Sequence, residues 1–408
     1  MKNYKILYLI SIALCLFGCK NNKDNIPFDS EKLLSFDIST VDNKEYEVKL
    51  SDLMESIEVI RMDNSTKEAY TKIFKVIVSD NYFATCEVDY PVKLFRRKDG
   101  KFLGNIGQPG QGPGEYFLIW DMVIDESRQR IYLANNSRNY IYSYDLQGNF
   151  HENETIYFPE GVKFWCGTIY VDKKEDKVLA FQTPASEYNR GNVHTDAIKN
   201  TSWVQDFKGN IDQYVPAERF VVAQGKSNTI WTSHINQDSP VYSYGIKNLD
   251  SQRADTLYHY NISNNEFYPV YTNNIQTKWL SIATSKESPL HYYTLQQKYK
   301  PGTDVNPENQ IGQKFLQVDK RTKEGRYIRL FNDYLGGIEI DPIEWYLHII
   351  DDYTICYLEP LELKEQLEEA LENNKDVSGE VRRRVVKLKD SLHENDNNIM
   401  IICKFKKQ

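Results

Sequence analysis

The chain has 408 residues, of which 50 are Lys or Arg and 58 are Asp or Glu, so its formal net charge is −8. This acidic balance argues against nucleic acid as a partner, because phosphate backbones require a basic face. The 6 cysteines show no CxxC spacing, which excludes a zinc knuckle and a dense disulfide scaffold. Cys356 and Cys403 both lie in strand-like runs, and whether they pair stays open.

The first residues resemble an export signal. Residues 6–17 form a nearly continuous apolar run after two lysines, which is too short to span a bilayer but typical of a secretory signal peptide. The run ends in LFGC (residues 16–19), which is similar to the bacterial lipobox, with an ordinary signal peptide as the alternative. We therefore expect a lipoprotein signal peptide at 1–18, lipidation of Cys19 with anchoring to a membrane, and a tether and lead-in over 19–50.

A repeat of short strands follows this segment. Residues 76–107 and 122–158 both read as strand, Asp-containing turn, strand, polar turn, strand, Gly turn and strand. Gly100 and Gly148 mark equivalent hairpins 48 residues apart, and Gly209 takes the same place in a third copy. Four short strands in each unit, at a period of about 40 to 60 residues, are typical of a propeller blade.

The remaining length sets the number of repeats. The sequence predicts an all-β fold, a six-bladed β-propeller over residues 51–408. The apolar runs 57–62 and 398–405 have no blade of their own, and we expect them to close the ring within the last blade. The approximate blades are 73–107, 115–158, 162–215, 217–262, 268–331 and 336–406.

One segment breaks the β pattern. Apolar residues recur at helical spacing over about 361–392, with a break near residue 379, so a C-terminal helical insertion is predicted in the last blade. An arginine triplet at 382–384 is expected to pair with Glu368 and Glu369 rather than with anionic lipid. The periodic residues are Leu363, Leu367, Leu371, Val381, Val385, Leu388 and Leu392.

Four features together carry a family resemblance: the lipobox, the degenerate six-blade pattern, the late helical insertion and the segment GQPGQGPGEY (residues 107–116). The chain resembles the Bacteroidetes six-bladed β-propeller lipoproteins, which are relatives of the NHL-repeat propellers. This resemblance implies a lipid-anchored protein of the cell envelope, at the outer membrane and either periplasmic or surface-exposed. It also implies a glycan or a protein as the partner.

The glycine-rich segment either cradles a phosphate or turns a corner. Residues 104–116 hold 5 glycines and 2 prolines but no Lys, Ser or Thr, and a strand-like run follows where a phosphate loop needs a helix. We therefore predict a corner between two blades that brings side chains to the channel mouth, where loops on a rigid scaffold often bind ligands. The candidate ligand-binding residues are Gln111, Glu115, Tyr116, Trp120 and Asp121.

The sequence favours binding over catalysis. The 7 histidines form no HxH or HExxH pattern, and GxSxG is absent, so no catalytic or metal-ligating residue is assigned and no cofactor is expected. The predicted function is a binding or scaffolding module for a glycan or peptide ligand at the channel face. The alternative is a Ca²⁺-dependent hydrolase or lyase of the lactonase or arylesterase type, with Glu115, Asp121 and Asn135 as candidate Ca²⁺ ligands.

Overall fold

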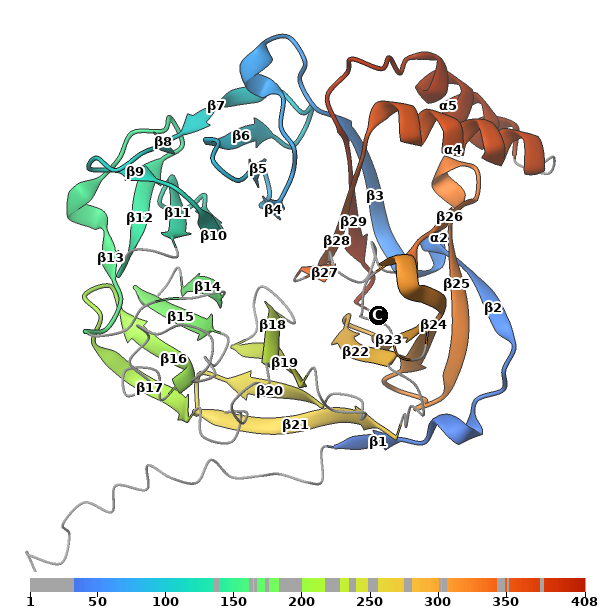
Figure 1. Cartoon of the computed structure of the whole chain (residues 1–408), viewed down its shortest axis with the longest axis horizontal. Coiled ribbons are helices and arrows are strands. Elements are labelled where there is room, and N and C mark those ends of the chain that lie inside the picture. The colour runs from blue at the N-terminus through green and yellow to red at the C-terminus, as the bar shows by residue number, and fades with distance from the viewer. Residues whose placement is uncertain are drawn as a thin grey trace, which may run out of the picture.

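The structure is a computed structural model in which the strands form a closed ring of six sheets (Figure 1). It describes residues 33–135, 139–160, 164, 167–172, 176–182, 200–216, 228–234, 240–248, 256–274, 281–300, 302, 307–342, 349–350, 352–374 and 378–407. Each sheet contains four antiparallel strands, and two sheets gain further edge strands. The predicted six-bladed β-propeller with a helical insertion in its last blade is therefore confirmed.

The first three blades follow the predicted repeat. Their short strands are rich in β-branched and aromatic residues, which fit a pleated, buried surface. Blade 1 consists of β4 (Lys75–Val78), β5 (Tyr82–Cys86), β6 (Val92–Arg96) and β7 (Phe102–Ile106). Blade 2 consists of β10 (Ile119–Asp125), β11 (Arg130–Asn135), β12 (Tyr140–Asp145) and β13 (Ile156–Tyr157). Blade 3 consists of β14 (Gly167–Asp172), β15 (Lys177–Gln182), β16 (Asn200–Asp206) and β17 (Ile211–Pro216).

The next two blades are less regular. Blade 4 consists of β18 (Asn228–His234), β19 (Val241–Asn248), β20 (Leu257–Asn261) and β21 (Glu266–Asn273). Blade 5 consists of β22 (Ser281–Glu287), β23 (His291–Tyr299), β24 (Gln310–Asp319) and β25 (Gly325–Asn332), with β26 (Ile338–Ile340) paired to β25. The expectation that the fifth blade begins at residue 268 is wrong. A tight turn at Asn265, with φ of 55°, folds β21 back onto β20 and so completes blade 4.

The segment before blade 1 wraps the outside of three blades. The strand β1 (Leu34–Phe36) pairs in parallel with β21, and β2 (Glu45–Lys49) pairs in parallel with β25 (Figure 1). A short helix, α2 (Leu50–Leu53), then leads into β3 (Met54–Arg61). The propeller therefore begins before residue 51, and residues 34–49 belong to its blades rather than to a free lead-in. We call residues 34–61 the N-terminal strap.

The last blade joins the two ends of the chain. It consists of β27 (Ile349–Ile350), β28 (Tyr353–Leu358), β29 (Ile399–Phe405) and β3. The strands β29 and β3 are antiparallel, with Met400 opposite Ile60. Both residues pack in one cluster with Phe83 and Phe95 of blade 1. The predicted closure by an early and a late strand is confirmed.

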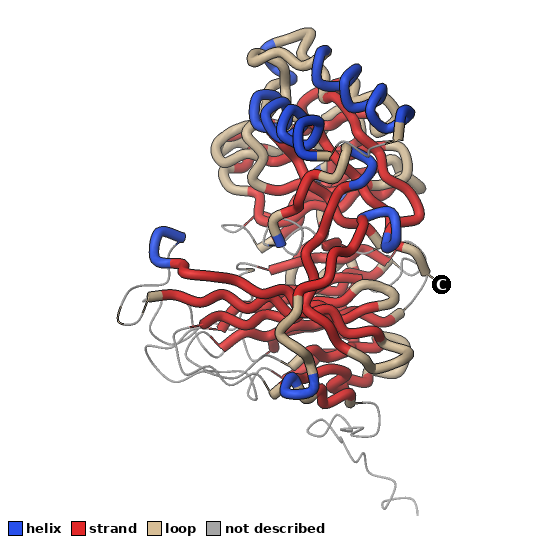
Figure 2. Tube along the Cα trace, turned by 90° about the vertical axis from the view of Figure 1, so that its right-hand side faces the viewer, coloured by secondary structure: helices blue, strands red, loops and turns tan. Residues whose placement is uncertain are grey.

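A helical hairpin interrupts blade 6. The helices α4 (Pro360–Asn373) and α5 (Gly379–Asp390) lie between β28 and β29 and stand together at one edge of the ring (Figures 1 and 2). Leu363, Leu367 and Val385 are fully buried in the same core cluster. The expected pairing of the arginine triplet needs correction. Arg384 stacks on the Tyr334 ring at 3.6 Å and donates to its carbonyl oxygen, while Glu368 lies 3.7 Å from Lys389.

Turns between the third and fourth strands lock successive blades together. We call the turns around Gly100, Gly148 and Gly209 the rim turns. Gly148 has φ of 88°, and a Cβ on it would lie 2.2 Å from the carbonyl oxygen of Asn105 in the preceding blade. A Cβ on Gly100, with φ of 70°, would lie 2.0 Å from the carbonyl oxygen of Arg61 in β3. Only glycine fits these positions, which explains the glycine repeat in the sequence.

Candidate functional site

The glycine-rich segment turns the corner from blade 1 to blade 2. Two short parallel strands, β8 (Gln108–Pro109) and β9 (Glu115–Tyr116), fold the segment back on itself. The Glu115 carboxylate accepts hydrogen bonds from the Gly112 amide at 2.8 Å and from Gln108 Nε2 at 2.7 Å. These hydrogen bonds lower the pKa of Glu115. The carboxylate predicted to meet a ligand therefore holds its own loop in shape.

Tyr116 lies inside the interface between blades 1 and 2. Its side chain is buried, and its hydroxyl accepts from the Val92 amide at 2.7 Å and donates to the Ile106 carbonyl at 2.5 Å. Burial raises the pKa of this hydroxyl well above its ordinary value. Tyr142 and Tyr144 donate to the carbonyl oxygens of residues 115 and 114. Because its ring and hydroxyl are both engaged, Tyr116 supports the corner and is not part of a ligand surface.

Asp121 links three inner strands beside the channel. It is buried on β10, and one carboxylate oxygen forms an ion pair with Lys75 of β4. The other oxygen accepts the Ile169 amide of β14 at 2.7 Å. Lys75 also donates to the Trp120 carbonyl at 3.3 Å. The ammonium group of Lys75 therefore stands at the start of two blades with part of its surface open to solvent.

Exposed aromatic side chains lie on the loops that lead into β4 and β10. The second-to-third-strand connections and the blade-to-blade connections lie at the same end of a propeller channel, because the strands of a blade run up and down. Residues 62–74, 87–91 and 107–118 are three such connections next to one another, and we call them the blade 1 loops. Of the eleven large apolar side chains that are exposed in the described part of the chain, five lie on these loops: Tyr70, Phe74, Val88, Tyr90 and Phe117. Single exposed apolar side chains are normal on a protein surface, but five on three adjacent loops form a cluster.

The backbone under these side chains is held in place. The Phe74 amide donates to the Cys86 carbonyl at 2.9 Å, and the Lys72 amide donates to the Glu87 carboxylate at 3.0 Å. The Phe74 ring, 50% exposed, meets the edge of the half-buried Trp120 ring with centroids 6.1 Å apart. Gln111 is exposed at the tip of the glycine corner. The blade 1 loops thus present aromatic rings from a fixed backbone.

A further lysine lies on an inner strand on another side of the ring. Lys286 lies on β22, the inner strand of blade 5, and is half-buried. Burial lowers the pKa of Lys286 to about 7, and the positive charge of Lys75 adds to this shift. The two ammonium groups therefore influence each other across the ring.

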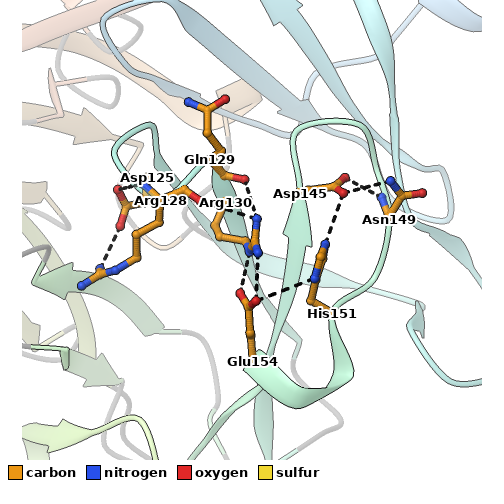
Figure 3. A network of polar contacts seen from close by, with 8 residues as sticks. All are labelled: Asp125, Arg128, Gln129, Arg130, Asp145, Asn149, His151 and Glu154. Atoms are coloured by element: carbon orange, nitrogen blue, oxygen red, sulfur yellow. Dashed lines mark hydrogen bonds and ion pairs between the residues drawn. The ribbon is translucent and has the colours of Figure 1, made fainter.

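Polar networks elsewhere support turns. At blade 2, His151 Nε2 lies 3.2 Å from Asp145 Oδ2, and Arg130 donates to both oxygens of Glu154 at 2.6 and 2.8 Å (Figure 3). Burial alone would raise the pKa of Asp145, but hydrogen bonds from Asn149 and His151 outweigh burial and lower it to about 2. Each carboxylate here is occupied by donors of the same blade, so the network stabilises the fold.

A buried carboxylate joins blades 4 and 5 in the same way. Glu287 Oε1 lies 2.8 Å from His259 Nε2, and Lys320 donates to Oε2 at 2.5 Å. Burial would raise the pKa of Glu287, but the charges of Lys320 and His259 outweigh burial and hold it well below its ordinary range. Lys320 also lies 4.7 Å from the centre of the Tyr292 ring. A paired and hydrogen-bonded buried charge of this kind is a structural contact.

The structure gives no support to the Ca²⁺ alternative. Among the described residues, no group of three or more His, Cys, Asp or Glu side chains is placed to hold a metal ion. The carboxylates of Glu115 and Asp121 are occupied by the loop amide and by Lys75. Asn135 is buried at the end of β11.

The described cysteines Cys86, Cys356 and Cys403 are free thiols. Thr354, two residues before Cys356, lies opposite Cys403 in the sheet, so the two cysteines are neighbours on adjacent strands without a bond. Burial raises the pKa of Cys403 well above its ordinary value. Cys166 and the predicted lipidation site Cys19 lie outside the described residues.

The sequence singled out Trp120 and Asp121 but missed their partners. Phe74 directly precedes β4, Lys75 is the first residue of β4, and Tyr90 lies in the short connection between β5 and β6. These residues come near the glycine corner only because the blades are arranged in a ring. An aromatic residue directly followed by a charged residue at the start of an inner strand, as in Phe74-Lys75 and Trp120-Asp121, is the signal that could have found the pair.

Fold and site together define a six-bladed β-propeller with an aromatic, charged channel mouth. A family model described as a domain of unknown function (DUF4934) matches residues 33–404, and the chain belongs to this family. In the described residues, no helix is both long and apolar enough to cross a membrane.

Two solved structures are similar to the chain. The chain is similar to a Bacteroides fragilis NCTC 9343 protein whose name describes it as exported, with 14% identity over 92% of this chain and 99% of that one, at a TM-score of 0.55. It is also similar to a member of the DUF4221 family from Bacteroides vulgatus ATCC 8482, with 11% identity over 87% of this chain and 97% of that one, at a TM-score of 0.47. No curated protein matches the chain. At such identities the similarity concerns the fold alone.

Proposed function

We propose that this protein is a lipid-anchored binding module of the cell envelope that holds a carbohydrate chain on the blade 1 loops. The observation that carries the proposal is the group of exposed aromatic side chains on the blade 1 loops, together with the contact between the Phe74 and Trp120 rings. Sugar rings pack their apolar faces on aromatic rings. The nearby amide of Gln111 and the ammonium of Lys75 can hydrogen-bond sugar hydroxyl groups.

A fixed backbone favours binding by such a surface. The loop amides that hold Phe74 and the residues around Glu115 are already hydrogen-bonded. A preorganised site loses less entropy when a ligand binds. The name of the Bacteroides fragilis relative, which describes an exported protein, supports a place in the cell envelope for this chain.

The test is a titration of Trp fluorescence with neutral hexasaccharides of glucose, mannose and xylose. Trp120 lies at the site, so bound sugar should change its emission. We expect Phe74→Ala and Trp120→Ala to weaken binding by about tenfold each, because each removes one stacking ring. Calorimetry replaces fluorescence for Trp120→Ala.

Tyr157→Ala is the matched control. Tyr157 is 49% exposed but lies on β13, on the outer side of blade 2. This variant should bind as wild type does. If a peptide such as hexa-alanine binds and the sugars do not, or if Tyr157→Ala weakens sugar binding as strongly as Phe74→Ala, the carbohydrate assignment is wrong.

The anchor has a separate test. Residues 16–19 read LFGC, and we propose that a lipid on Cys19 holds the protein at a membrane, with NHL-like propeller lipoproteins as its wider group. Cys19→Ala should move the protein from the membrane fraction to the soluble fraction while its melting temperature stays the same. A variant that stays with membranes after a carbonate wash would contradict the anchor.

A further inference from the structure

A cavity lies where blade 6 meets blade 1. Its volume is about 540 Å³. It is at the opposite end of blade 1 from the blade 1 loops, because it opens at the turn between β4 and β5. We call it the seam cavity. It is lined by Ser56, Glu58, Asp80, Asn81, Tyr82, Arg96, Arg97, Lys98, Tyr353 and Lys404.

The lining of the seam cavity is rich in cationic side chains that have carboxylate neighbours. Four lining side chains are Lys or Arg, and two are Asp or Glu. Glu55 and Asp99 pair with two of the cations, and Glu126 accepts a hydrogen bond from the Asn81 amide, so carboxylates balance these cations. An anion would therefore bind here by replacing carboxylates as the partners of the cations.

One of the four cationic side chains, Arg97, forms part of the floor of the seam cavity. Arg97 is buried, donates to both oxygens of Glu58 at 3.1 and 2.6 Å and to the Ser79 carbonyl at 2.9 Å, and lies 4.9 Å from the centre of the Tyr353 ring. These contacts tie a turn of blade 1 to two strands of blade 6. Arg97 is thus fixed in place under the cavity.

The other three cations can exchange partners. Arg96 pairs with Asp99 at 2.5 Å, and both side chains are more than 40% exposed. Lys404 lies 3.3 Å from the exposed Glu55. Lys98 is exposed. Exposed ion pairs of this kind contribute little to stability, so an anion that meets several of these cations at once can replace their carboxylate partners.

Size and chemistry narrow the class of ligand. A cavity of about 540 Å³ is far larger than an inorganic ion needs and lies within the range of about 300–1,000 Å³ for small-molecule sites. The rings of Tyr82 and Tyr353 give it an apolar wall. We propose that the seam cavity binds a small organic anion with two or more acidic groups, and that the bound anion joins blade 6 to blade 1.

Calorimetric titration of the whole mature protein with citrate, glucose 6-phosphate and inorganic phosphate, at constant ionic strength, tests the proposal. We expect saturable binding of citrate or glucose 6-phosphate with a Kd of about 1 mM or tighter. Binding of citrate alone identifies carboxylates as the recognised group, and binding of the sugar phosphate alone identifies phosphate. A response to all three anions that does not saturate, or no response, overturns the proposal.

Variants place the site. Lys98→Met and Lys404→Met should each raise the Kd by about tenfold, whereas Lys387→Met, an equal loss of charge on the exposed side of α5, should leave it unchanged. Glu58→Gln should have the opposite effect and tighten binding, because it removes a carboxylate that faces the anion, although the ring becomes less stable. Equal Kd values in wild type, Lys98→Met and Lys404→Met, or weaker binding by Glu58→Gln, would show that the anion binds elsewhere.

Discussion

The rim turns and the glycine-rich member of the blade 1 loops, residues 107–118, look alike in sequence, since both combine glycines with Asp, Asn or Glu. In the rim turns the polar side chains hydrogen-bond to groups of their own turn. Asp145 accepts the amides of Gln147 and Asn149 and the side chain of Asn149, and Gly148 touches the neighbouring blade. In the blade 1 loops the backbone is satisfied just as well, yet aromatic rings such as Phe74 and Tyr90 stay about half exposed.

The difference separates support from recognition. In one kind of turn the carboxylate, the glycine and the amides all have partners within the ring. Such a turn holds blades together and is structural. In the other kind of loop the backbone is held in place while apolar rings stay exposed. Burial of these rings against a partner would then contribute to the free energy of binding. Four substitutions test this division, from the largest expected loss of stability to the smallest.

Gly148→Ala should be the most damaging. Its Cβ would meet the Asn105 carbonyl at 2.2 Å, at a φ of 88°, so we expect a loss of about 2 to 4 kcal/mol in the free energy of unfolding, measured by urea denaturation. Gly302→Ala is the control, since φ is 76° there and nothing lies within 4 Å of the added Cβ. It should lose only about 1 kcal/mol. Equal losses would mean that contact between blades contributes nothing at the rim turn.

Gly114 and Gly112 form a matched pair inside the glycine corner. Gly114 has φ of 71°, and its Cβ would lie 2.6 Å from the Phe150 ring, whereas a Cβ on Gly112 would meet only the flexible end of Glu115 at 3.1 Å. Gly114→Ala should cost about 1 to 3 kcal/mol, and Gly112→Ala less than about 0.5 kcal/mol. Thermal unfolding of both variants measures the difference. If both keep their melting temperature, the corner is not a structural element.

Asp145→Asn probes the rim turn through pH. The folded-state pKa is about 2, below the unfolded value of about 4, so the carboxylate stabilises the fold above pH 4 and this contribution is lost as pH falls through 2. We expect the variant to be about 2 kcal/mol less stable at pH 7 and the gap to close in acid. Denaturation midpoints at several pH values give the result. A gap that stays constant with pH would contradict the assigned role of the carboxylate.

Tyr90→Ser should be the mildest change. The ring is 54% exposed on a blade 1 loop, so the free energy of unfolding should stay within about 0.5 kcal/mol of wild type. Urea denaturation, with Tyr142→Ser as a buried comparison, measures this. A loss as large as that of the buried variant would place Tyr90 in the core and weaken the case for a binding surface.

Much of the fold follows from local signals. Turn glycines such as Gly100 and Gly148 recur because each blade needs the same close approach, and Leu363 and Leu367 mark a helix by their spacing. The first two strands of the strap, β1 and β2, were not predicted, because β2 (EYEVK) buries a single side chain fully and so lacks the apolar alternation that reveals inner strands.

The candidate site was only partly predictable. Trp120 and Asp121 follow directly from the glycine corner, but the partner of Asp121 is Lys75, which lies in another blade. Such pairs depend on the curvature of the ring, which no window of sequence contains. The role given to Tyr116 failed for a related reason, since burial between blades cannot be read from a single aromatic residue.

The N-terminal strap also determines when the ring of blades can close. In the final sheet Arg61 lies opposite Ile399, so the earliest long strand waits for almost the last segment to be synthesised. Pairings this distant in sequence are slow to form, and a chain that lacks them exposes unpaired edges. A polypeptide that crosses a membrane unfolded, beginning with its N-terminus, would keep β3 vacant until β29 emerges. The circular architecture thereby delays completion of the last blade until β29 is available to pair with β3.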